Sequence, residues 1–532
     1  MPSASRLTVL DGESSVGGTK ILLDTGSAGL LLDFGTNYKR MGQYYEEFLH
    51  PRPARGITDL LAVGLLPERR GLYRPDLLPT TDFPRGDADF PGEAPAAVLL
   101  THAHLDHCGA LAFLDPTIPI YATPASVATL RAVQESGKSD VTTEFAYYTP
   151  RVDRGDGLLA TERKGPRSRR AFHLFGEFTS GLVEALRAPP ARHGEFEGPD
   201  PASAAGDPVT RAFRIESFPV DHSLLGSAAF VLDVDGARVA YTGDVRFHGA
   251  RGRETEAFLR AMELRHPDVL LVEGTRLRRS DADHLPPQTS EAEVRANATA
   301  KVREYGGRLV IADFGPRNIE RLTTFREVAR ESDRQLVVTA KDAYLLHLLR
   351  HVDPSVPVDF GPGGMRIWKE PSVRQPLAWQ ERIEAAYPDA SMDAAEIIAA
   401  PGRVVLCFSF FDANDLVDLR RATTGGLWLY SSSEAHGEEQ EFDFVRLQAW
   451  IAWAGLHQVG FRVDPADGRP QFEPGYHASG HATESELIDL VRRAQARVIV
   501  PVHSETPGRY QKILGPEGAK VRLLRAGEPL EL

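Results

Sequence analysis

The sequence contains little cysteine: only Cys108 and Cys407 occur among its 532 residues. Two cysteines cannot build a disulfide framework or a zinc module made of thiolates. A cysteine-poor chain is typical of a reducing compartment. We therefore expect a cytoplasmic protein, and its length is sufficient to bury full hydrophobic cores without covalent cross-links.

Long apolar runs are also missing. No stretch approaches the roughly 18–20 apolar residues that a membrane-spanning helix requires. The N-terminal sequence MPSASRLTVLDGESSVGG has neither the basic start nor the apolar core of a signal peptide. The pattern predicts a protein without a membrane segment or a secretory leader.

Positive charge is not in excess. The chain has 61 Lys and Arg against 74 Asp and Glu, which gives a formal net charge of −13 at pH 7. This balance argues against a protein that coats nucleic acid by charge alone. It leaves open a nucleic-acid enzyme with a locally basic groove.

The residue patterns that are present divide the chain into three parts. Residues 1–275 contain short apolar strands such as KILLDTG, and a segment at about 139–210, rich in Pro, Gly and acid, that predicts an insertion or surface loop. Residues 276–470 alternate amphipathic helices with buried strands such as RLVIADF, which predicts a parallel α/β domain. Residues 471–532 predict a capped helix that begins near Thr483, followed by a short strand.

Potential metal ligands follow several of the predicted strands. The stretch LLTHAHLDHCGAL contains His102, His104, Asp106 and His107. Three further candidates stand at or just beyond other strand ends: His222, Asp244 and His503. Imidazole nitrogen and carboxylate oxygen are ligands that Zn²⁺ accepts. Five histidines and two aspartates exceed one tetrahedral site but suit two ions bridged by a carboxylate.

The order of the motifs resembles a known family. GLLLDFG, LLTHAHLDHCGAL, VDHS and YTGDVRFHG resemble the first four motifs of the metallo-β-lactamase superfamily. LLVEGT, SGHA and PVHSE resemble motifs A, B and C of its β-CASP branch, which includes ribonuclease J and the 3′-end-processing endonucleases of the cleavage and polyadenylation machinery. The resemblance spans roughly residues 17–510. It implies an α/β fold, namely a metallo-β-lactamase αββα sandwich with an inserted α/β β-CASP domain.

The resemblance also assigns the metal ligands. One Zn²⁺ would be bound by His102, His104 and His222. A second would be bound by Asp106, His107 and His503, with Asp244 bridging the two ions. Asp33 matches the acid of the first motif and is expected to orient a ligand rather than to bind metal. Histidine and carboxylate ligands also bind Mn²⁺, so the sequence leaves the choice between Zn²⁺ and Mn²⁺ open.

Catalytic roles follow from the same comparison. Glu273 matches the motif A acid and His481 the motif B histidine, so the expected catalytic residues are Asp106, His481 and Glu273. His481 would donate a proton to the leaving oxygen, oriented by Glu273. His477 and Ser479 would lie near a substrate phosphate.

Two departures from the family pattern concern the end of the chain. Ser504 follows the motif C histidine, where the family usually has glycine. The sequence ends at residue 532, and the C-terminal oligomerising domain of ribonuclease J is expected to be absent. We therefore expect a monomer or a homodimer.

The resemblance implies a zinc-dependent ribonuclease that hydrolyses phosphodiester bonds of single-stranded RNA with two metal ions, by internal cuts, stepwise trimming or both. A DNA nuclease of the same fold is the alternative, because no sequence feature distinguishes a ribose from a deoxyribose substrate. The long segment between Glu273 and His481 argues against a small-molecule hydrolase of the lactonase or thioesterase type. A non-catalytic RNA-binding subunit ranks last, because all seven candidate ligands are present.

Overall fold

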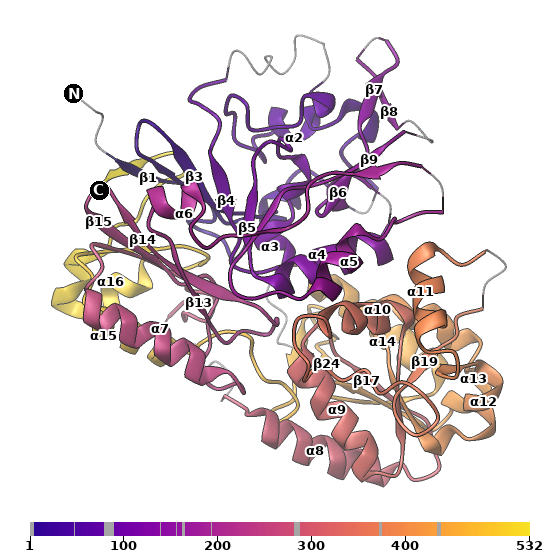
Figure 1. The fold of residues 1–532 in the computed structure, drawn as a ribbon. Coiled ribbons are helices and arrows are strands. Elements are labelled where there is room, and N and C mark those ends of the chain that lie inside the picture. The colour runs from indigo at the N-terminus through magenta and orange to yellow at the C-terminus, as the bar shows by residue number, and fades with distance from the viewer. Residues whose placement is uncertain are drawn as a thin grey trace.

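A computed structural model describes residues 5–46, 48–78, 90–138, 140–155, 157–161, 165–192, 194–280, 288–315, 317–371, 375–432 and 438–532, with the backbone alone for 438–443. The described residues form three large sheets with helices packed on them (Figure 1). Two of these sheets face each other. The third is formed by strands within residues 310–459, before the C-terminal segment returns to the first two sheets.

The largest sheet has eight strands in the order β12-β10-β5-β4-β3-β2-β1-β27. Its strands are β1 (Arg6–Asp11), β2 (Lys20–Asp24), β3 (Gly29–Phe34), β4 (Ala97–Leu99), β5 (Ile120–Ala122), β10 (Phe172–Leu174), β12 (Ala202–Ser203) and β27 (Pro529–Glu531). The strands from β3 to β12 run parallel, whereas β27, β1, β2 and β3 pair antiparallel.

The second sheet has five strands in the order β13-β14-β15-β16-β26. They are β13 (Glu216–Pro219), β14 (Ala228–Val234), β15 (Ala237–Tyr241), β16 (Val269–Val272) and β26 (Val498–Pro501). Asp235 and Gly236, both with positive φ, turn the chain between β14 and β15, because an Asp-Gly pair suits the two-residue loop of a β-hairpin.

The two sheets share one core. Leu30 and Leu99 of the first sheet are fully buried in the same cluster as Phe230 and Leu271 of the second. Helices cover the outer faces, so the fold is an αββα sandwich, as the resemblance implied. The sandwich helices are α1 (Tyr38–Met41), α2 (Thr58–Ala62), α3 (Leu105–Cys108), α4 (Pro124–Ser136), α6 (Pro208–Ala212), α7 (Gly252–Arg265), α15 (Glu484–Ala494) and α16 (Arg509–Leu514).

The third sheet has seven parallel strands in the order β20-β19-β18-β21-β17-β22-β23. They are β17 (Val310–Asp313), β18 (Gln335–Val338), β19 (Arg366–Trp368), β20 (Ser391–Met392), β21 (Val404–Cys407), β22 (Leu427–Tyr430) and β23 (His457–Val459). Its helices are α8 (Glu291–Glu304), α9 (Ile319–Glu331), α10 (Ala340–Leu349), α11 (Ala378–Ala386), α12 (Ala394–Ala399), α13 (Arg420–Thr423) and α14 (Glu438–Ala454). The predicted alternation of helix and strand is therefore confirmed.

The segment 139–210 contributes more than the surface loop that its composition suggested. Its strand β10 extends the eight-stranded sheet beside β5, because Phe172 and Leu174 are apolar enough to be buried there. The remaining elements are β6 (Tyr147–Tyr148), β7 (Arg151–Asp153), β8 (Leu159–Thr161), β9 (Arg167–Arg169), β11 (Phe196–Glu197) and α5 (Ser180–Arg187). Residues 139, 156, 162–164 and 193 of this segment lie outside the described part.

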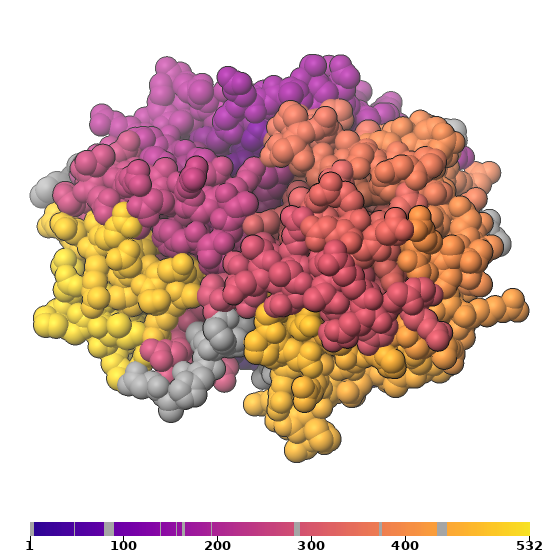
Figure 2. Space-filling model, turned by 90° about the horizontal axis from the view of Figure 1, so that it is seen from below, coloured from indigo at the N-terminus to yellow at the C-terminus, as the bar shows by residue number. Residues whose placement is uncertain are grey.

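The sandwich and the seven-stranded unit meet along an extended contact (Figures 1 and 2). Helix α4 packs against α10, and Glu135 of α4 accepts hydrogen bonds from Tyr344 and Arg382. A hairpin of β24 (Phe461–Val463) and β25 (Pro470–Phe472) then leads the chain back to the sandwich. No helix among the described residues is long and apolar enough to cross a membrane.

Truncation of the core leucine Leu271 tests the shared core. Leu271 is fully buried between the sheets, whereas Leu264 on α7 is 84% exposed. We expect Leu271→Ala to lower the free energy of unfolding by about 2–5 kcal/mol, through lost burial and the cavity that remains. Leu264→Ala should change it by less than about 0.5 kcal/mol. Equal denaturation midpoints for the two variants would contradict the sandwich core.

Candidate metal centre

The predicted ligands meet at one edge of the sandwich. His102, Asp244 and His503 each stand a few residues beyond the end of a strand: β4, β15 and β26, respectively. These strands come from both sheets, so the folded sandwich brings together side chains that are 400 residues apart in the sequence. His222 reaches the same edge from the loop between β13 and β14.

One ligand group consists of His102, His104, His222 and Asp244, whose ligand atoms lie within 4.8 Å of one another. His104 Nδ1 lies 3.0 Å from His102 Nε2 and 3.1 Å from His222 Nε2. Asp244 Oδ2 lies 3.6 Å from His102 Nε2. Ligand atoms on a tetrahedral ion, each about 2.1 Å from the metal, are about 3.4 Å apart. The spacing therefore fits a metal ion.

The second group consists of Asp106, His107 and His503. His503 Nε2 lies 3.0 Å from Asp106 Oδ2, and His107 Nε2 lies 3.9 Å from the same oxygen. Asp244 Oδ2 is 3.3 Å from His107 Nε2 and thus approaches both groups. This position is the one that a bridging carboxylate requires.

The chemistry of the ligand atoms also fits metal ions. His107 Nε2 and Asp244 Oδ1 are buried and form no hydrogen bond with any described residue. The other ring nitrogen of two histidines is occupied: His222 Nδ1 donates to the Gly480 carbonyl at 2.6 Å, and His107 Nδ1 lies 2.7 Å from Asp33. Such pairing leaves Nε2 available for a metal, since it fixes the tautomer of the ring.

Burial keeps the first group of histidines neutral. It lowers the pKa of His102 and His222 well below the ordinary value, and that of His104 to about 4. Burial alone would raise the pKa of Asp244, but the imidazoles of His503 and His107 hold it well below the usual range. Neutral imidazoles beside an ionised carboxylate are the forms that bind Zn²⁺.

Asp33 lies beneath the ligands with a fully buried carboxylate. It accepts hydrogen bonds from the Thr101 amide at 2.7 Å, the Thr101 hydroxyl at 2.8 Å and the Tyr241 hydroxyl at 2.7 Å. Its backbone is left-handed, with φ of 55°. Strained backbone of this kind is retained where a side chain must point in a required direction, and here the carboxylate is directed at His107.

Close backbone packing positions Asp106. The amides of Gly18 and Thr19 donate to its carbonyl at 3.0 and 3.1 Å. A Cβ atom on Gly35 would stand 1.6 Å from that carbonyl oxygen, and one on Gly17 would stand 2.8 Å from Asp106 Cβ. Gly17, between β1 and β2, and Gly35, after β3, are therefore required for helix α3, which carries Asp106, to pack this closely.

His481 and Glu273 lie beside the ligand groups. His481 Nδ1 is 3.1 Å from Glu273 Oε2 and 3.9 Å from Asp244 Oδ2. The Val245 amide fixes Glu273 by donating to its carboxylate at 2.8 Å. Burial alone would lower the pKa of His481, but the carboxylates of Glu273 and Asp244 raise it above the ordinary value.

The two predicted phosphate contacts are placed differently from each other. Ser479 is buried, and its hydroxyl accepts from the His481 amide at 3.2 Å. His477 is also buried, but its ring nitrogens lie 2.8 and 2.6 Å from the carbonyls of Ser432 and Gly460. A phosphate contact by His477 stays a prediction, and it would require one of these carbonyls to be exchanged for a phosphate.

The sequence motifs did not single out Arg246, which supports the centre. Arg246 is buried, pairs with Asp221 at 2.9 Å, and donates to the Ser479 carbonyl at 3.3 Å. Its place two residues after Asp244 was a usable signal, since a charged residue so close to a buried ligand needs a partner. Ser504, the departure from the family glycine, donates to the Gly274 carbonyl at 3.1 Å and is fully buried.

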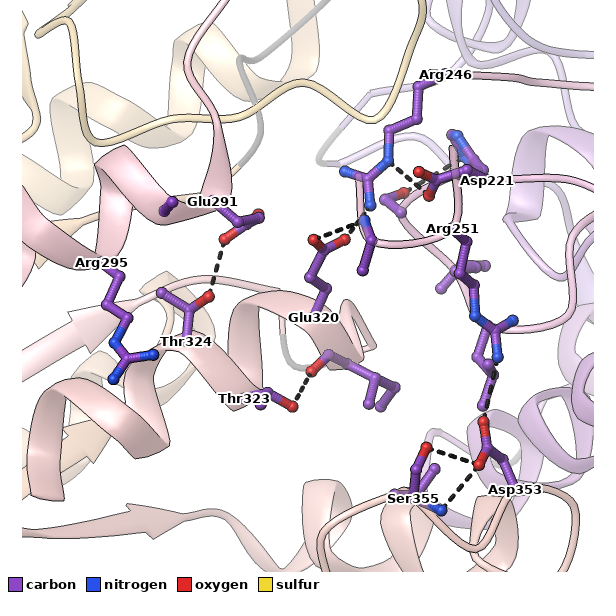
Figure 3. A pocket seen from close by; sticks show the side chains of 18 of the residues that line it. Asp221, Arg246, Arg251, Glu291, Arg295, Glu320, Thr323, Thr324, Asp353 and Ser355 are labelled. Atoms are coloured by element: carbon purple, nitrogen blue, oxygen red, sulfur yellow. Dashed lines mark hydrogen bonds and ion pairs between the residues drawn. The ribbon is translucent and has the colours of Figure 1, made fainter. Parts of the chain in front are cut away.

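Two cavities adjoin the ligands. One of about 650 Å³ is lined by His104 and extends over the ends of strands in the seven-stranded sheet. The other, of about 370 Å³, includes His222 in its lining. There Arg246 points between Asp221 and Glu320, and Arg251 reaches Asp353, so these arginines are paired with carboxylates (Figure 3).

Two family descriptions match parts of the chain. Residues 75–288 match the Metallo-beta-lactamase superfamily, and residues 469–508 match the Zn-dependent metallo-hydrolase RNA specificity domain. The superfamily match covers strands of both sheets of the sandwich but less than half of the whole chain. The second match covers the part of the chain that holds His481 and His503.

Individual relatives agree with these two matches. Ribonuclease J of Mycolicibacterium smegmatis is 22% identical over 76% of this chain, and that of Sinorhizobium meliloti is 22% identical over 77%. The aligned part makes up 58% and 57% of these relatives, so the chain spans less than two thirds of their length. Transcription termination factor FttA of Pyrococcus horikoshii is 32% identical over 22% of the chain and 14% of its own length. The ribonuclease J-like resemblance within the superfamily is thus confirmed.

A solved structure supports the fold as a whole. The crystal structure of a protein of unknown function from Enterococcus faecalis V583 matches with a TM-score of 0.66 at 20% identity, covering 100% of both chains. A divalent metal site is expected from the superfamily, and the grouped His and Asp residues are its candidate ligands.

Removal of the Asp244 carboxylate tests the metal centre. We expect wild-type protein dialysed against excess Zn²⁺ to retain two ions per chain, measured by inductively coupled plasma mass spectrometry. Asp244→Ala should lose at least one ion, because this carboxylate approaches both ligand groups. His457→Ala, which changes an exposed histidine outside the centre, should bind as the wild type does. Full metal content in Asp244→Ala would refute the bridging position.

Proposed function

We propose that the protein is a zinc-dependent ribonuclease that hydrolyses phosphodiester bonds of single-stranded RNA with two metal ions. The observation that carries this proposal is the His481–Glu273 pair, at 3.1 Å, next to two groups of metal ligands. A small-molecule hydrolase of this fold does not need the seven-stranded unit that lies in the sequence between Glu273 and His481. The match to an RNA specificity domain over residues 469–508 favours RNA as the substrate.

The ligand set of the proposed centre is the one expected from the motifs. His102, His104 and His222 would bind one ion, Asp106, His107 and His503 the other, and Asp244 would contact both. Divalent ions bound there lower the pKa of a water molecule and draw electron density from the phosphate. Asp33 keeps the ring of His107 in the orientation and tautomer that present Nε2 to the metal.

The chain's own proton donor would complete the reaction. The oxygen that leaves phosphorus gains negative charge and needs a proton. His481 is held beside the ligands by Glu273, and the carboxylates of Glu273 and Asp244 raise its pKa above the ordinary value, which favours the protonated form. It would protonate the leaving oxygen, and Glu273 would stabilise the imidazolium beforehand.

Organisation and location are part of the same proposal. The division into residues 1–275, 276–470 and 471–532 is supported by the three sheets, since β26 and β27 of the last segment belong to the sandwich. Both cysteines are buried free thiols, which supports a cytoplasmic location. A monomer or homodimer is proposed from the sequence alone.

A cleavage assay tests the proposed activity. One sequence is made as 5′-labelled single-stranded RNA and as DNA and is incubated with Zn²⁺ or Mn²⁺. We expect RNA cleavage, lost on chelation and in Asp106→Ala, and a ladder that separates stepwise trimming from internal cuts. His481→Ala should keep its metal and lose about 10²–10⁴-fold in rate. Activity on lactones or thioesters without any RNA cleavage would overturn the proposal.

The pH profile tests the proton donor. A protonated acid is present below its pKa and is lost as the pH rises through it, so kcat/KM should fall on the alkaline side at the pKa of His481. Glu273→Gln removes the carboxylate that raises this pKa, so the alkaline limb should move to lower pH. Metal content should be unchanged, which separates this effect from loss of the centre. An unmoved limb would exclude His481 as the donor.

A further inference from the structure

The loop that carries His481 is held by both units of the molecule. At its start, the Tyr476 carbonyl accepts from the Ser431 hydroxyl of the seven-stranded unit at 2.6 Å. At its end, the Ala482 amide donates to the Val245 carbonyl of the sandwich at 2.6 Å. The chain therefore crosses from one unit to the other between Tyr476 and Ala482, and His481 lies in that crossing.

Ser479 lies within this crossing, and its carbonyl is held by two side chains of the sandwich. Arg246 Nη1 donates to it at 3.3 Å and His248 Nε2 at 3.0 Å. Arg246 is 1% exposed, so its hydrogen bonds are little weakened by water. Because Ser479 precedes His481 by two residues, the position of the arginine influences the position of the proposed proton donor.

Arg246 is in turn held by a carboxyl group from the other unit. Its Nε donates to Asp221 Oδ1 at 2.9 Å, and its Nη2 donates to Glu320 Oε2 in the first turn of α9 (Figure 3). The Ala250 amide donates to the second oxygen of Glu320 at 3.0 Å. Burial raises the pKa of Glu320, whereas the Arg246 guanidinium opposes that rise. The carboxyl group accepts from Arg246 in either protonation state, so the contact does not depend on the ionisation of Glu320.

A second ion pair joins the same two units without touching this loop. Arg251, the residue before α7, pairs with Asp353 at 3.1 Å in the lining of the same cavity (Figure 3). Among the described residues, neither partner forms a hydrogen bond or ion pair with residues 476–482. The two pairs therefore separate a contact that only joins the units from one that also reaches the loop of His481.

We propose that Glu320 is a positioning residue for His481, which it holds in place through Arg246. A general acid must lie within about 2.6–3.2 Å of the atom that it protonates. A displacement of the loop by about 1 Å would therefore lower the rate of proton transfer. The seven-stranded unit would in this way contribute to the geometry of the reaction through a residue that need not touch the RNA. The inference rests on the proposed function, in which His481 is the proton donor.

The experiment compares Glu320→Ala with Asp353→Ala, the matched control that removes the other ion pair between the units. We expect Glu320→Ala to lower kcat about ten- to hundredfold, because the proton donor is displaced. KM and metal content should be unchanged, because Glu320 belongs to neither ligand group. Asp353→Ala should leave kcat, KM and metal content as in the wild type.

Arg246→Gln tests the route by which Glu320 acts. In that background the fork is already lost, so Glu320→Ala should lower kcat further by less than about twofold, as expected of residues that share one contact. Independent losses that multiply would contradict action through Arg246. The comparison of Glu320→Ala with Asp353→Ala does not require the Arg246 variant to fold.

Hydrogen exchange provides a readout that needs no RNA. Amide exchange in residues 476–484, measured by mass spectrometry, should be about tenfold faster in Glu320→Ala than in wild type, because loss of charged hydrogen bonds makes opening of the loop easier. Asp353→Ala should exchange in this segment as the wild type does.

The outcomes separate the positioning role from the nuclease. An equal kcat in wild type and Glu320→Ala, or an equal loss in the two alanine variants, would overturn the positioning role and leave the nuclease intact. If wild-type protein cuts no RNA, the proposed function fails, and hydrogen exchange decides the inference. Faster exchange in Glu320→Ala alone then supports the positioning of the loop, and equal exchange in all three proteins refutes it.

Discussion

Asp33, the second-to-last residue of strand β3, has a carboxylate that is not exposed to solvent and is surrounded by donors from both sheets. Thr101 follows β4 in the first sheet, and Tyr241 ends β15 in the second. A buried carboxylate is costly unless it is hydrogen-bonded on all sides. The arrangement therefore holds the two sheets in one relative position, and His107, which pairs with the same carboxylate, takes its orientation from them. The other ligands depend on that position, since Asp244 and His503 follow strands of the second sheet.

Arg246 extends this dependence to the seven-stranded unit. Its guanidinium group pairs with Asp221 beside His222, with Glu320 of α9, and with the Ser479 carbonyl in the loop that carries His481. A buried arginine fork of this kind fixes three segments at once, because its donors have a rigid geometry. A shift of α9 relative to the sandwich would therefore reach both a metal ligand and the proposed proton donor. The two units and the chemistry between them are mechanically coupled.

Much of the fold, and the residues that would form a metal centre, could be predicted from the sequence, because both depend on local patterns; the structure brings these residues together, and their binding of metal stays a prediction. Asp235 and Gly236 predict a hairpin, and Thr483 with Glu486 predicts the helix start that is observed. The motif around His102 is dense enough to indicate a metal site by itself. The contact of Arg246 with Glu320 and the buried pairing of His477 could not be predicted, since they depend on which side chains from distant segments meet. Strand β10 was missed because the Pro- and Gly-rich residues around it concealed a short apolar run.

The five-stranded sheet has a consequence for the order in which the protein assembles. Strand β16 pairs with β26, and Val269 lies opposite Val498 in this pair. The edge of β16 is therefore covered only after residue 498 has been synthesised. Until then the sandwich exposes an unpaired, apolar strand, and an exposed edge of this kind favours association with other chains. His503 lies two residues after β26, so the last of the candidate ligands reaches its place only when that edge closes. Pairing of β26 would therefore cover the edge of β16 and complete the candidate metal centre in one step.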